Sequence, residues 1–163
     1  MPVFVVHKHQ ASRLHYDFRL EVAGALKSWA VPKGPRLVTS VKRLAVRVED
    51  HALDYGGFEG VIPADEYGGG PVMIWDEGEV VWPEGKTPET MLDAGLVEFE
   101  LRGTKLKGSW KLIHAKLGGD ERNWLLIKRK DAFAGTVDDV LTRLPNSARS
   151  GRSMEEITRE SAP

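Results

Sequence analysis

A histidine and an aspartate stand two residues apart near the start of the chain, at His15 and Asp17. They fall in a stretch from residue 14 to residue 22 in which apolar and polar residues alternate strictly, a pattern typical of a β-strand with one buried face. On such a strand the two side chains project from the same polar face, with Cα atoms about 6.5 Å apart. That spacing suits two ligands that converge on one cation.

His9 lies just upstream, beyond a short connection, and can fold over the same face. Two imidazoles and one carboxylate, with further positions open, form a site for Mn²⁺, Zn²⁺ or Fe²⁺. Such an ion would polarise a phosphoryl oxygen or activate a water. We therefore predict that His9, His15 and Asp17 hold a divalent metal. The alternative is a solvated strand face with an incidental histidine–aspartate pair.

Further charged side chains could act on a phosphate. Arg19 extends the polar row, and a guanidinium beside a His/Asp metal site is suited to bind a phosphate group. A second alternating stretch, residues 42–51, ends in His51, whose pKa near neutrality suits a general acid or a donor to phosphate. Arg43 and Glu49 are expected on the same face as His51. They would either join the site or form a salt bridge with each other.

Lys33 lies in the sequence Pro32-Lys33-Gly34-Pro35, which ends a strand and makes a stiff loop. A cation held on such a loop suits phosphate binding, and an ordinary surface lysine is the alternative. Lys33 is therefore a further candidate for the site.

Charge is strongly segregated along a chain whose net charge is −1. Residues 1–47 carry nine basic and two acidic side chains, residues 48–100 one basic and fourteen acidic, and residues 101–163 thirteen basic and eight acidic. A basic block fits a polyanionic partner, because Lys and Arg release phosphate counterions on binding. We therefore expect DNA to lie along residues 1–47 and to avoid the acidic stretch 54–76. Mutual neutralisation of the blocks across a folded sheet is the alternative.

Length and composition limit the class of protein. With 163 residues, 41% of them hydrophobic and 29% charged, the chain fits one soluble domain with a real core. The absence of cysteine excludes disulfides and thiolate metal sites, so a metal would need histidine, carboxylate or backbone ligands. No apolar run approaches membrane-spanning length, and a cytoplasmic location is the default expectation.

Strands dominate the expected secondary structure, which favours a mainly β fold: a compact antiparallel β-barrel with one or two short helices. Thr87, Pro88 and Gly95 are suited to begin and end one such helix. Residues 54–70, rich in glycine and acid, predict a long loop. Strands are expected at 14–22, 25–31, 42–51, 71–76, 79–82, 96–101, 109–116 and 123–130, the fourth and fifth as a hairpin around Glu77-Gly78.

The chain is expected to divide into one domain and a tail. The domain would span residues 1–143, and the polar residues 144–163 would form a flexible tail or linker. Within that tail Ser153 and Glu156 have the spacing of a capping box and could begin a short helix.

Four spaced motifs resemble the 3′-phosphoesterase domain of bacterial DNA ligase D, a module of bacterial and archaeal non-homologous end joining. The first is His-Lys-His-x5-His-Tyr-Asp-Phe-Arg-Leu-Glu at residues 7–21, and the second is Leu-Lys-Ser-Trp-Ala-Val-Pro-Lys-Gly-Pro at 26–35. Lys-Arg-Leu-Ala-Val-x-Val-Glu-Asp-His-x-Leu-Asp-Tyr follows at 42–55, and Phe-Glu-Gly-x-Ile-Pro-x-x-Glu-Tyr-Gly-Gly-Gly at 58–70. The resemblance continues to about residue 131, and residues 150–157 look like the linker to a ligase domain.

The resemblance implies a compact antiparallel barrel that binds Mn²⁺, or another divalent metal such as Zn²⁺ or Co²⁺, through His9, His15 and Asp17. It also implies that Arg19, His51 and Tyr55 engage the phosphate, and that three further residues are linked to activity: Lys33, Arg43 and Glu49. The family removes a 3′-terminal ribonucleoside to leave a 3′-phosphate, and then hydrolyses that phosphate to a 3′-hydroxyl that a ligase can seal.

The implied partners are DNA ends or primer–templates with a 3′-ribonucleotide or 3′-phosphate, an ATP-dependent DNA ligase in the same or a separate polypeptide, and the Ku end-binding protein. The implied location is the cytoplasm, in association with the nucleoid. A non-catalytic DNA-end or ligase-docking module of the same fold and a small-molecule metallophosphatase are the alternatives.

Two departures from the family affect these expectations. His7 stands where many members have glutamine, so we expect it to add a metal ligand or to contact a nucleotide. Bacterial members also carry an N-terminal arm with further active-site residues, and this chain begins almost at the first motif. The phosphatase step is therefore expected more firmly than the ribonuclease step.

Overall fold

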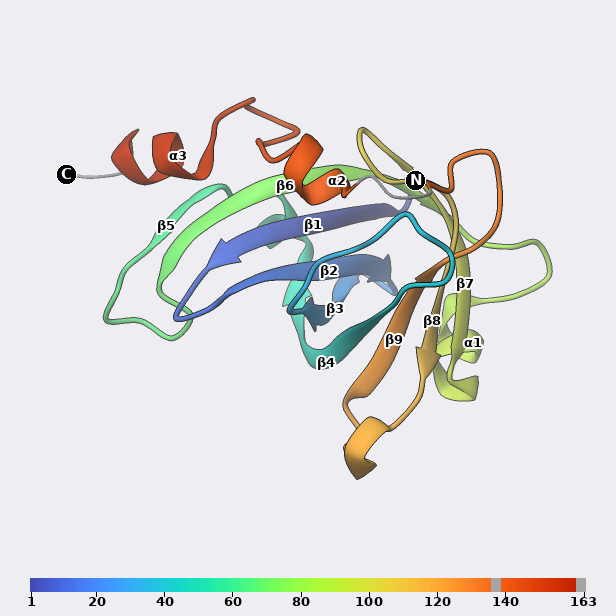
Figure 1. Ribbon diagram of the computed structural model, residues 1–163. Helices are drawn as coiled ribbons and strands as arrows, with labels where there is room; N and C mark the ends of the chain where they lie inside the picture. Colours follow the sequence, from blue (N-terminus) through green and yellow to red (C-terminus); the bar gives the residue numbers. More distant parts are fainter. Residues whose placement is uncertain (136–138, 161–163) are drawn as a thin grey trace.

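The computed structural model describes residues 1–135 and 139–160 of the chain (Figure 1). Its strands are β1 Val3–Gln10, β2 Leu14–Val22, β3 Ala25–Val31, β4 Lys42–Ala52, β5 Gly60–Ile62, β6 Gly70–Val81, β7 Leu96–Gly103, β8 Lys107–His114 and β9 Asn123–Lys128. Its helices are η1 Leu53–Gly57, α1 Pro88–Ala94, η2 Leu117–Gly119, α2 Val140–Arg143 and α3 Met154–Glu160. None of the helices described is long and apolar enough to cross a membrane.

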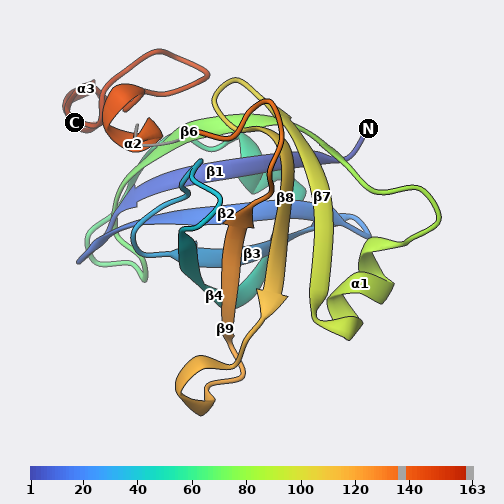
Figure 2. The ribbon, with the colours of Figure 1, turned by 45° about the vertical axis from the view of Figure 1, so that its right-hand side comes forward.

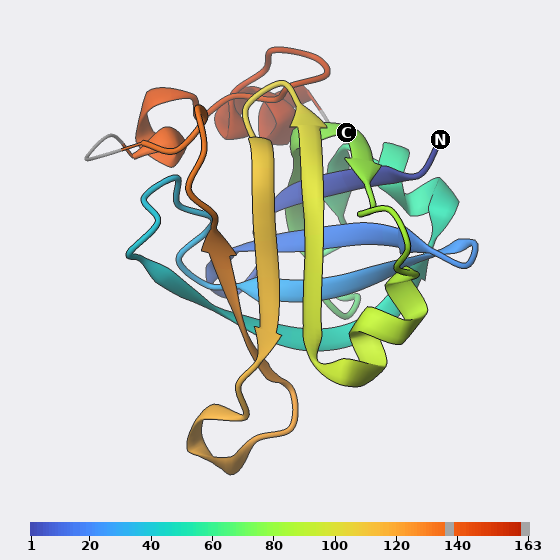
Figure 3. The same ribbon diagram turned by 90° about the vertical axis from the view of Figure 1, so that its right-hand side faces the viewer.

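Eight strands form a closed antiparallel barrel in the order β1-β2-β3-β4-β9-β8-β7-β6 (Figures 1 and 3). The barrel closes because β1 pairs with β2 along one edge and with β6 along the other. The short strand β5 adds to β6 outside the barrel, and α1 lies beside β7 (Figure 2). The predicted fold class, mainly β with a few short helices, is confirmed.

The alternation that predicted β2 separates two chemically different faces. Tyr16, Phe18, Leu20 and Val22 point into the barrel and are at most 5% exposed. The opposite face carries His15, Asp17, Arg19 and Glu21. Three tryptophans fill the core with no exposed surface: Trp29, Trp75 and Trp110. This apolar burial fixes the register of β2, because a slip by one residue would turn the polar row into the core.

The predicted hairpin around Glu77-Gly78 is wrong, since β6 runs without a turn from residue 70 to residue 81. Gly78 instead lies where β7 crosses closely: a Cβ atom there would be 2.1 Å from the carbonyl oxygen of Arg102. In a strand, glycine can mark a close backbone approach as well as a turn. β6 also has a register shift opposite Val6 and His7, which bends it around the barrel.

A second irregularity changes the faces of β4. Leu26 of β3 pairs with His51 and Ser28 pairs with Val48, so Glu49 and Asp50 bulge opposite a single β3 residue. Before the bulge, Ala45 belongs to the core, and Arg43 shares its face by alternation. Past the bulge, His51 points to the outer side. The expectation that Arg43 and His51 share one face is therefore wrong.

Residues predicted to form a long loop or a loose tail cover the outer faces of β1 and β6. The stretch 54–70 contains most of η1 and all of β5, and so it is not one loop. Residues 147–157 pack on β6 and β5, and Ile157 of α3 has no exposed surface (Figure 1). The division into domain 1–143 and tail 144–163 stays a prediction, and residues 161–163 lie outside the described part of the chain.

Helix ends follow the predicted chemistry. The Thr87 hydroxyl accepts from the Thr90 amide at 3.2 Å, and Gly95 adopts a left-handed φ of 80° after α1. At α3 the Ser153 amide donates to the Glu156 carboxylate at 3.0 Å, and the Glu156 amide donates to the Ser153 hydroxyl at 3.1 Å. The predicted capping box is therefore confirmed.

Candidate metal and phosphate site

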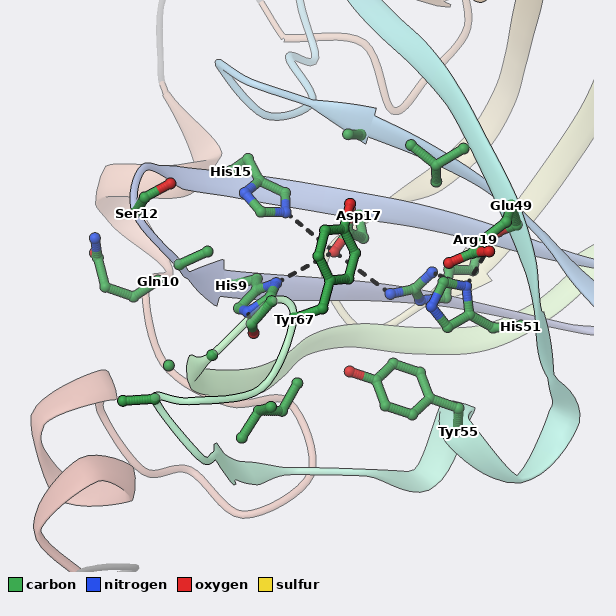
Figure 4. Close-up of a pocket in the computed structure, with 18 residues that line it drawn as sticks. His9, Gln10, Ser12, His15, Asp17, Arg19, Glu49, His51, Tyr55 and Tyr67 are labelled. Atoms are coloured by element: carbon green, nitrogen blue, oxygen red, sulfur yellow. Dashed lines mark hydrogen bonds and ion pairs between the residues drawn. The ribbon is translucent and has the colours of Figure 1, made fainter.

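The β1–β2 hairpin brings together the three predicted metal ligands on its polar face (Figure 4). His9 pairs directly with His15, and Asp17 follows one step along the same face. Oδ2 of Asp17 lies 3.2 Å from Nε2 of His15 and 3.7 Å from Nδ1 of His9. One ligand atom from each residue can be chosen so that all three lie within 4.8 Å of one another. The spacing is that of a candidate three-ligand metal site.

The remaining ring nitrogens are held by backbone carbonyls. Nε2 of His9 donates to the Gly68 carbonyl at 2.7 Å, and Nδ1 of His15 donates to the Arg13 carbonyl at 3.1 Å. Each bond leaves the other nitrogen, which faces Asp17, as the one able to bind a metal. Metal-binding histidines usually have this kind of outer partner, so the donor set fits a divalent transition metal.

The charges around Asp17 keep it ionised. Burial opposes its ionisation, but the hydrogen bond from His15, the neighbouring His9 ring and the charge of Arg19 outweigh burial and hold the pKa of Asp17 well below its usual range. The same hydrogen bond to Asp17 raises the pKa of His15. A bound cation would replace the proton that His15 shares with Asp17.

Arg19 is almost completely buried, with 2% of its surface exposed. Its Nη1 donates to the Ser28 hydroxyl at 2.8 Å and to Nδ1 of His51 at 3.0 Å, and its Nη2 lies 3.4 Å from Asp17. Its Nε donates to Nδ1 of His7 at 3.0 Å. A guanidinium has five N–H groups. Four of them point to protein acceptors, which fixes the plane and leaves one for a ligand.

His7 accepts a hydrogen bond from Arg19. The expectation that His7 adds a metal ligand or contacts a nucleotide is therefore wrong. The side chain has no exposed surface, and its Nε2 donates to the Phe58 carbonyl at 3.1 Å. Burial, with Arg19 alongside, lowers the pKa of His7 to about 3, so the ring is neutral. Because one nitrogen donates to Phe58 and the other accepts from Arg19, neither is available to a metal.

His51 and Tyr55 form the far wall of the pocket, from the end of β4 and from η1. Their rings lie 5.0 Å apart, and the Arg19 guanidinium stacks 5.1 Å from the Tyr55 ring centre. Burial lowers the pKa of His51, with the charge of Arg19 adding to the effect, and burial raises the pKa of Tyr55. Both side chains are therefore neutral near pH 7, and the Tyr55 hydroxyl is directed into the pocket (Figure 4).

A pocket of about 860 Å³ joins these groups. The predicted residues that line it are His9, His15, Asp17, Arg19, Glu49, His51 and Tyr55. Lys33 and Arg43 do not line it: Lys33 is exposed beyond the end of β3, and Arg43 lies on the other face of β4. Their link to activity stays a prediction.

The opposite rim of the pocket includes Tyr67, which the sequence interpretation did not single out. Its side chain is 98% exposed at the mouth of the pocket, beside the metal-ligand cluster (Figure 4). Three glycines follow, and the last of them lies close against β1: a Cβ at Gly70 would be 2.1 Å from the Gln10 carbonyl oxygen. An aromatic residue before a glycine run was the available signal.

The pocket draws on both the basic block 1–47 and the acidic stretch 54–76. The acidic stretch supplies Tyr55, Ile62, Ala64 and residues 67–70 to its lining. The expected path of DNA along residues 1–47 stays a prediction.

Fold and site together define a closed antiparallel β-barrel domain in which a His/His/Asp cluster adjoins a buried arginine. Residues 7–114 match the family of the DNA ligase D 3′-phosphoesterase domain. The chain belongs to this family.

Relatives of the chain are much longer proteins. It is 52% identical over 153 residues to the multifunctional non-homologous end joining protein LigD of Pseudomonas aeruginosa, covering 93% of the chain and 18% of the relative. It is 42% identical over 145 residues to that of Mycolicibacterium smegmatis, covering 86% and 18%. For the non-homologous end joining DNA repair protein LigD of Mycobacterium tuberculosis the identity is 45% over 129 residues, covering 78% and 16%. The chain thus spans less than a fifth of these relatives.

Proposed function

We propose that this domain heals DNA 3′ ends, by metal-dependent hydrolysis of a 3′-phosphate and by removal of a 3′-terminal ribonucleoside. The observation that carries the proposal is the convergence of Arg19, His51 and Tyr55 on the His9/His15/Asp17 cluster in one pocket. Membership of the phosphoesterase family supports hydrolysis of a phosphate ester. Mn²⁺ is the proposed ion, with Zn²⁺ or Co²⁺ as substitutes.

We propose a separate task for each group of residues in the pocket. When bound by His9, His15 and Asp17, the ion would neutralise phosphate charge and activate a water. Arg19, fixed by its partners, offers its remaining N–H to a phosphoryl oxygen. Because burial lowers its pKa, His51 begins as a neutral hydrogen-bond donor rather than as a ready general acid.

Nδ1 of His51 has two polar neighbours. Nη1 of Arg19, which can only donate, lies 3.0 Å away, and the Glu49 carbonyl, which can only accept, lies 3.2 Å away. We propose that Nδ1 accepts from Arg19, which leaves the proton of the neutral ring on Nε2 and available to a phosphate oxygen, as is the hydroxyl of Tyr55. Three donors of different geometry would then surround the group being transferred.

The biological setting is part of the proposal. The names of the relatives support a role in double-strand break repair by non-homologous end joining. The partners would be DNA ends, an ATP-dependent ligase in the same or a separate polypeptide, and Ku, in the cytoplasm at the nucleoid. Lys33, Arg43 and Glu49 would support activity from around the pocket.

One experiment separates this proposal from a docking module and from a small-molecule phosphatase. A primer–template with a 3′-phosphate and a generic aryl phosphate are each incubated with the protein and Mn²⁺, with and without chelator. We expect chelator-sensitive release of phosphate from DNA, and slower hydrolysis of the aryl ester. Binding of DNA without hydrolysis would favour the docking module, and a preference for the aryl ester would favour the small-molecule enzyme.

A further inference from the structure

Residues 147–157, which resemble a linker in sequence, are fastened to the outer wall of the pocket. The Ala148 amide donates to the Ile74 carbonyl of β6 at 2.9 Å, which adds this segment to the strand edge. At the other end, Ile157 of α3 is fully buried in the cluster that includes the barrel core. We call residues 147–157 the C-terminal strap.

Two arginines of the strap contact the residues on either side of Phe58, one at a backbone carbonyl and the other at a side-chain carboxylate. Nη1 of Arg149 donates to the Gly57 carbonyl at 3.3 Å, while its Nη2 and Nε bind the Glu77 carboxylate at 2.6 and 3.0 Å. Nη2 of Arg152 donates to the Glu59 carboxylate at 3.0 Å. The strap therefore binds both the residue before Phe58 and the residue after it.

Glu59 is the fixed point of this attachment. Its side chain is 7% exposed, and Oε1 accepts from the Ile74 amide of β6 at 2.8 Å. Oε2 accepts from the Ser150 hydroxyl at 2.5 Å and from Arg152. The Arg152 side chain is 28% exposed and also donates to Glu160 at 2.8 Å. Loss of a cationic partner is unfavourable for a nearly buried carboxylate, so the pair helps to hold Arg152 beside Glu59.

Phe58 links this attachment to the site. Its carbonyl oxygen receives the Nε2 proton of His7, and Nδ1 of His7 receives the Nε proton of Arg19. A displacement of the Phe58 carbonyl would free the His7 ring to rotate or change tautomer. Either change removes the acceptor that orients the Arg19 guanidinium. Small displacements of a positioned charge have large effects on rate.

We propose that the C-terminal strap positions Arg19 for phosphate binding, through Glu59, the Phe58 carbonyl and His7. Arg149, Arg152 and Glu59 are positioning residues, since none of them lines the pocket. The inference rests on the proposed function for its effect on turnover. In a longer protein the same segment would lead from the barrel toward the next domain. A movement of that domain could therefore change the position of Arg19.

Full-chain variants test the strap against a matched control. Arg152→Met and Glu59→Gln each break the Arg152–Glu59 ion pair, whereas Arg159→Met removes an exposed cation of α3 just beyond the strap. Arg152→Lys keeps the charge and serves as the conservative variant. Three quantities are measured: kcat/KM for a 3′-phosphate primer–template, Mn²⁺ affinity, and the solvent-exchange rate of the His7 Nε2 proton by NMR.

We expect Arg152→Met and Glu59→Gln to lower kcat/KM about 10- to 100-fold, as expected for a misplaced binding group, with unchanged Mn²⁺ affinity. Exchange of the His7 proton should become faster in both. Arg152→Lys should recover part of each loss, and Arg159→Met should match the wild type.

The proposal is overturned if the two variants melt at lower temperature while kcat/KM and His7 exchange equal those of Arg159→Met, because the strap would then be structural only. Absence of 3′-phosphatase activity in the wild type would instead refute the proposed function. The His7 exchange rate would still decide whether the strap controls this hydrogen-bond chain.

Discussion

Nε of Arg19 and Nδ1 of His7 are joined by a 3.0 Å hydrogen bond in which the arginine is the donor. The second nitrogen of His7 donates to a backbone carbonyl, so the residue at this position must both accept and donate. A glutamine side chain offers the same two functions through Oε1 and Nε2. Glutamine, which the sequence resemblance implies for many family members at this position, could therefore replace His7.

His7→Gln should therefore keep most of the phosphatase activity, and His7→Leu should lose it. Without an acceptor at this place, the buried Nε–H of Arg19 is unsatisfied, at a cost of about 1–3 kcal/mol. Steady-state kinetics on a 3′-phosphate primer–template, with Mn²⁺ affinity as the control, measure the effect. Equal activity in His7→Gln and His7→Leu would contradict the assigned hydrogen bonds.

His15→Ala and Asp17→Asn should each weaken Mn²⁺ binding strongly, because each removes one of three ligands that share a strand face. Calorimetric titration of Mn²⁺ measures the change, and His7→Gln is the matched control on the neighbouring strand. Wild-type affinity in both ligand variants would place the metal elsewhere.

His51→Ala should bind Mn²⁺ normally and lose about 10²–10³-fold in kcat for a 3′-phosphate, the usual cost of removing one hydrogen-bond donor to the charge that develops in the transition state. His51→Asn separates two roles, because asparagine can accept from Arg19 and donate to phosphate but cannot take up a proton. Substantial activity in the asparagine variant would make His51 a hydrogen-bond donor only. Loss of Mn²⁺ from the alanine variant would make it a metal ligand.

Tyr67→Ala should weaken binding of DNA and spare hydrolysis of a generic aryl phosphate. An exposed aromatic ring at the mouth of the pocket can stack on a terminal base, an interaction of about 1–3 kcal/mol. KM for a 3′-phosphate end is compared with KM for the same end carrying an abasic terminal sugar. Tyr67→Trp is the control that keeps an aromatic ring. An equal loss on both ends would exclude stacking.

Stability should fall in acid in a way that depends on Glu59. Burial opposes its ionisation, but hydrogen bonds from Ser147, Ser150, Ile74 and Arg152 outweigh burial and hold the pKa of Glu59 below its ordinary 4.5. A lowered folded pKa contributes stability above pH 4.5, and that contribution is lost as the pH falls through the folded pKa. Urea unfolding of the wild type should weaken more steeply in this range than that of Glu59→Gln. Parallel curves would contradict the lowered pKa.

The metal cluster could be predicted from local sequence, because strand alternation places His15 and Asp17 on one face and the hairpin brings His9 to it. The partners of Arg19 could not be predicted in the same way. Ser28, His51 and the His7–Phe58 contact reach Arg19 only through the pairing of later strands and the position of a helix. The bulge in β4 has no clear sequence mark, so alternation continued through it put Arg43 on the wrong face. Gly78 was misread because glycine permits both a turn and a close approach. These failures share one cause: tertiary contacts chose between local options that the residues left open.

The hairpin that carries His9, His15 and Asp17 has a consequence for the order of folding. All three ligands fall within nine consecutive residues, whereas β1 must wait for β6, more than sixty residues later, to close the barrel. Hairpins form in about 1–10 μs, and non-local strand pairing is far slower. We therefore expect Mn²⁺ to bind the first hairpin before the barrel closes and to speed refolding. The consecutive strands β2, β3 and β4 bring Arg19 and His51 together by local pairing, so these two residues would also meet before the barrel closes.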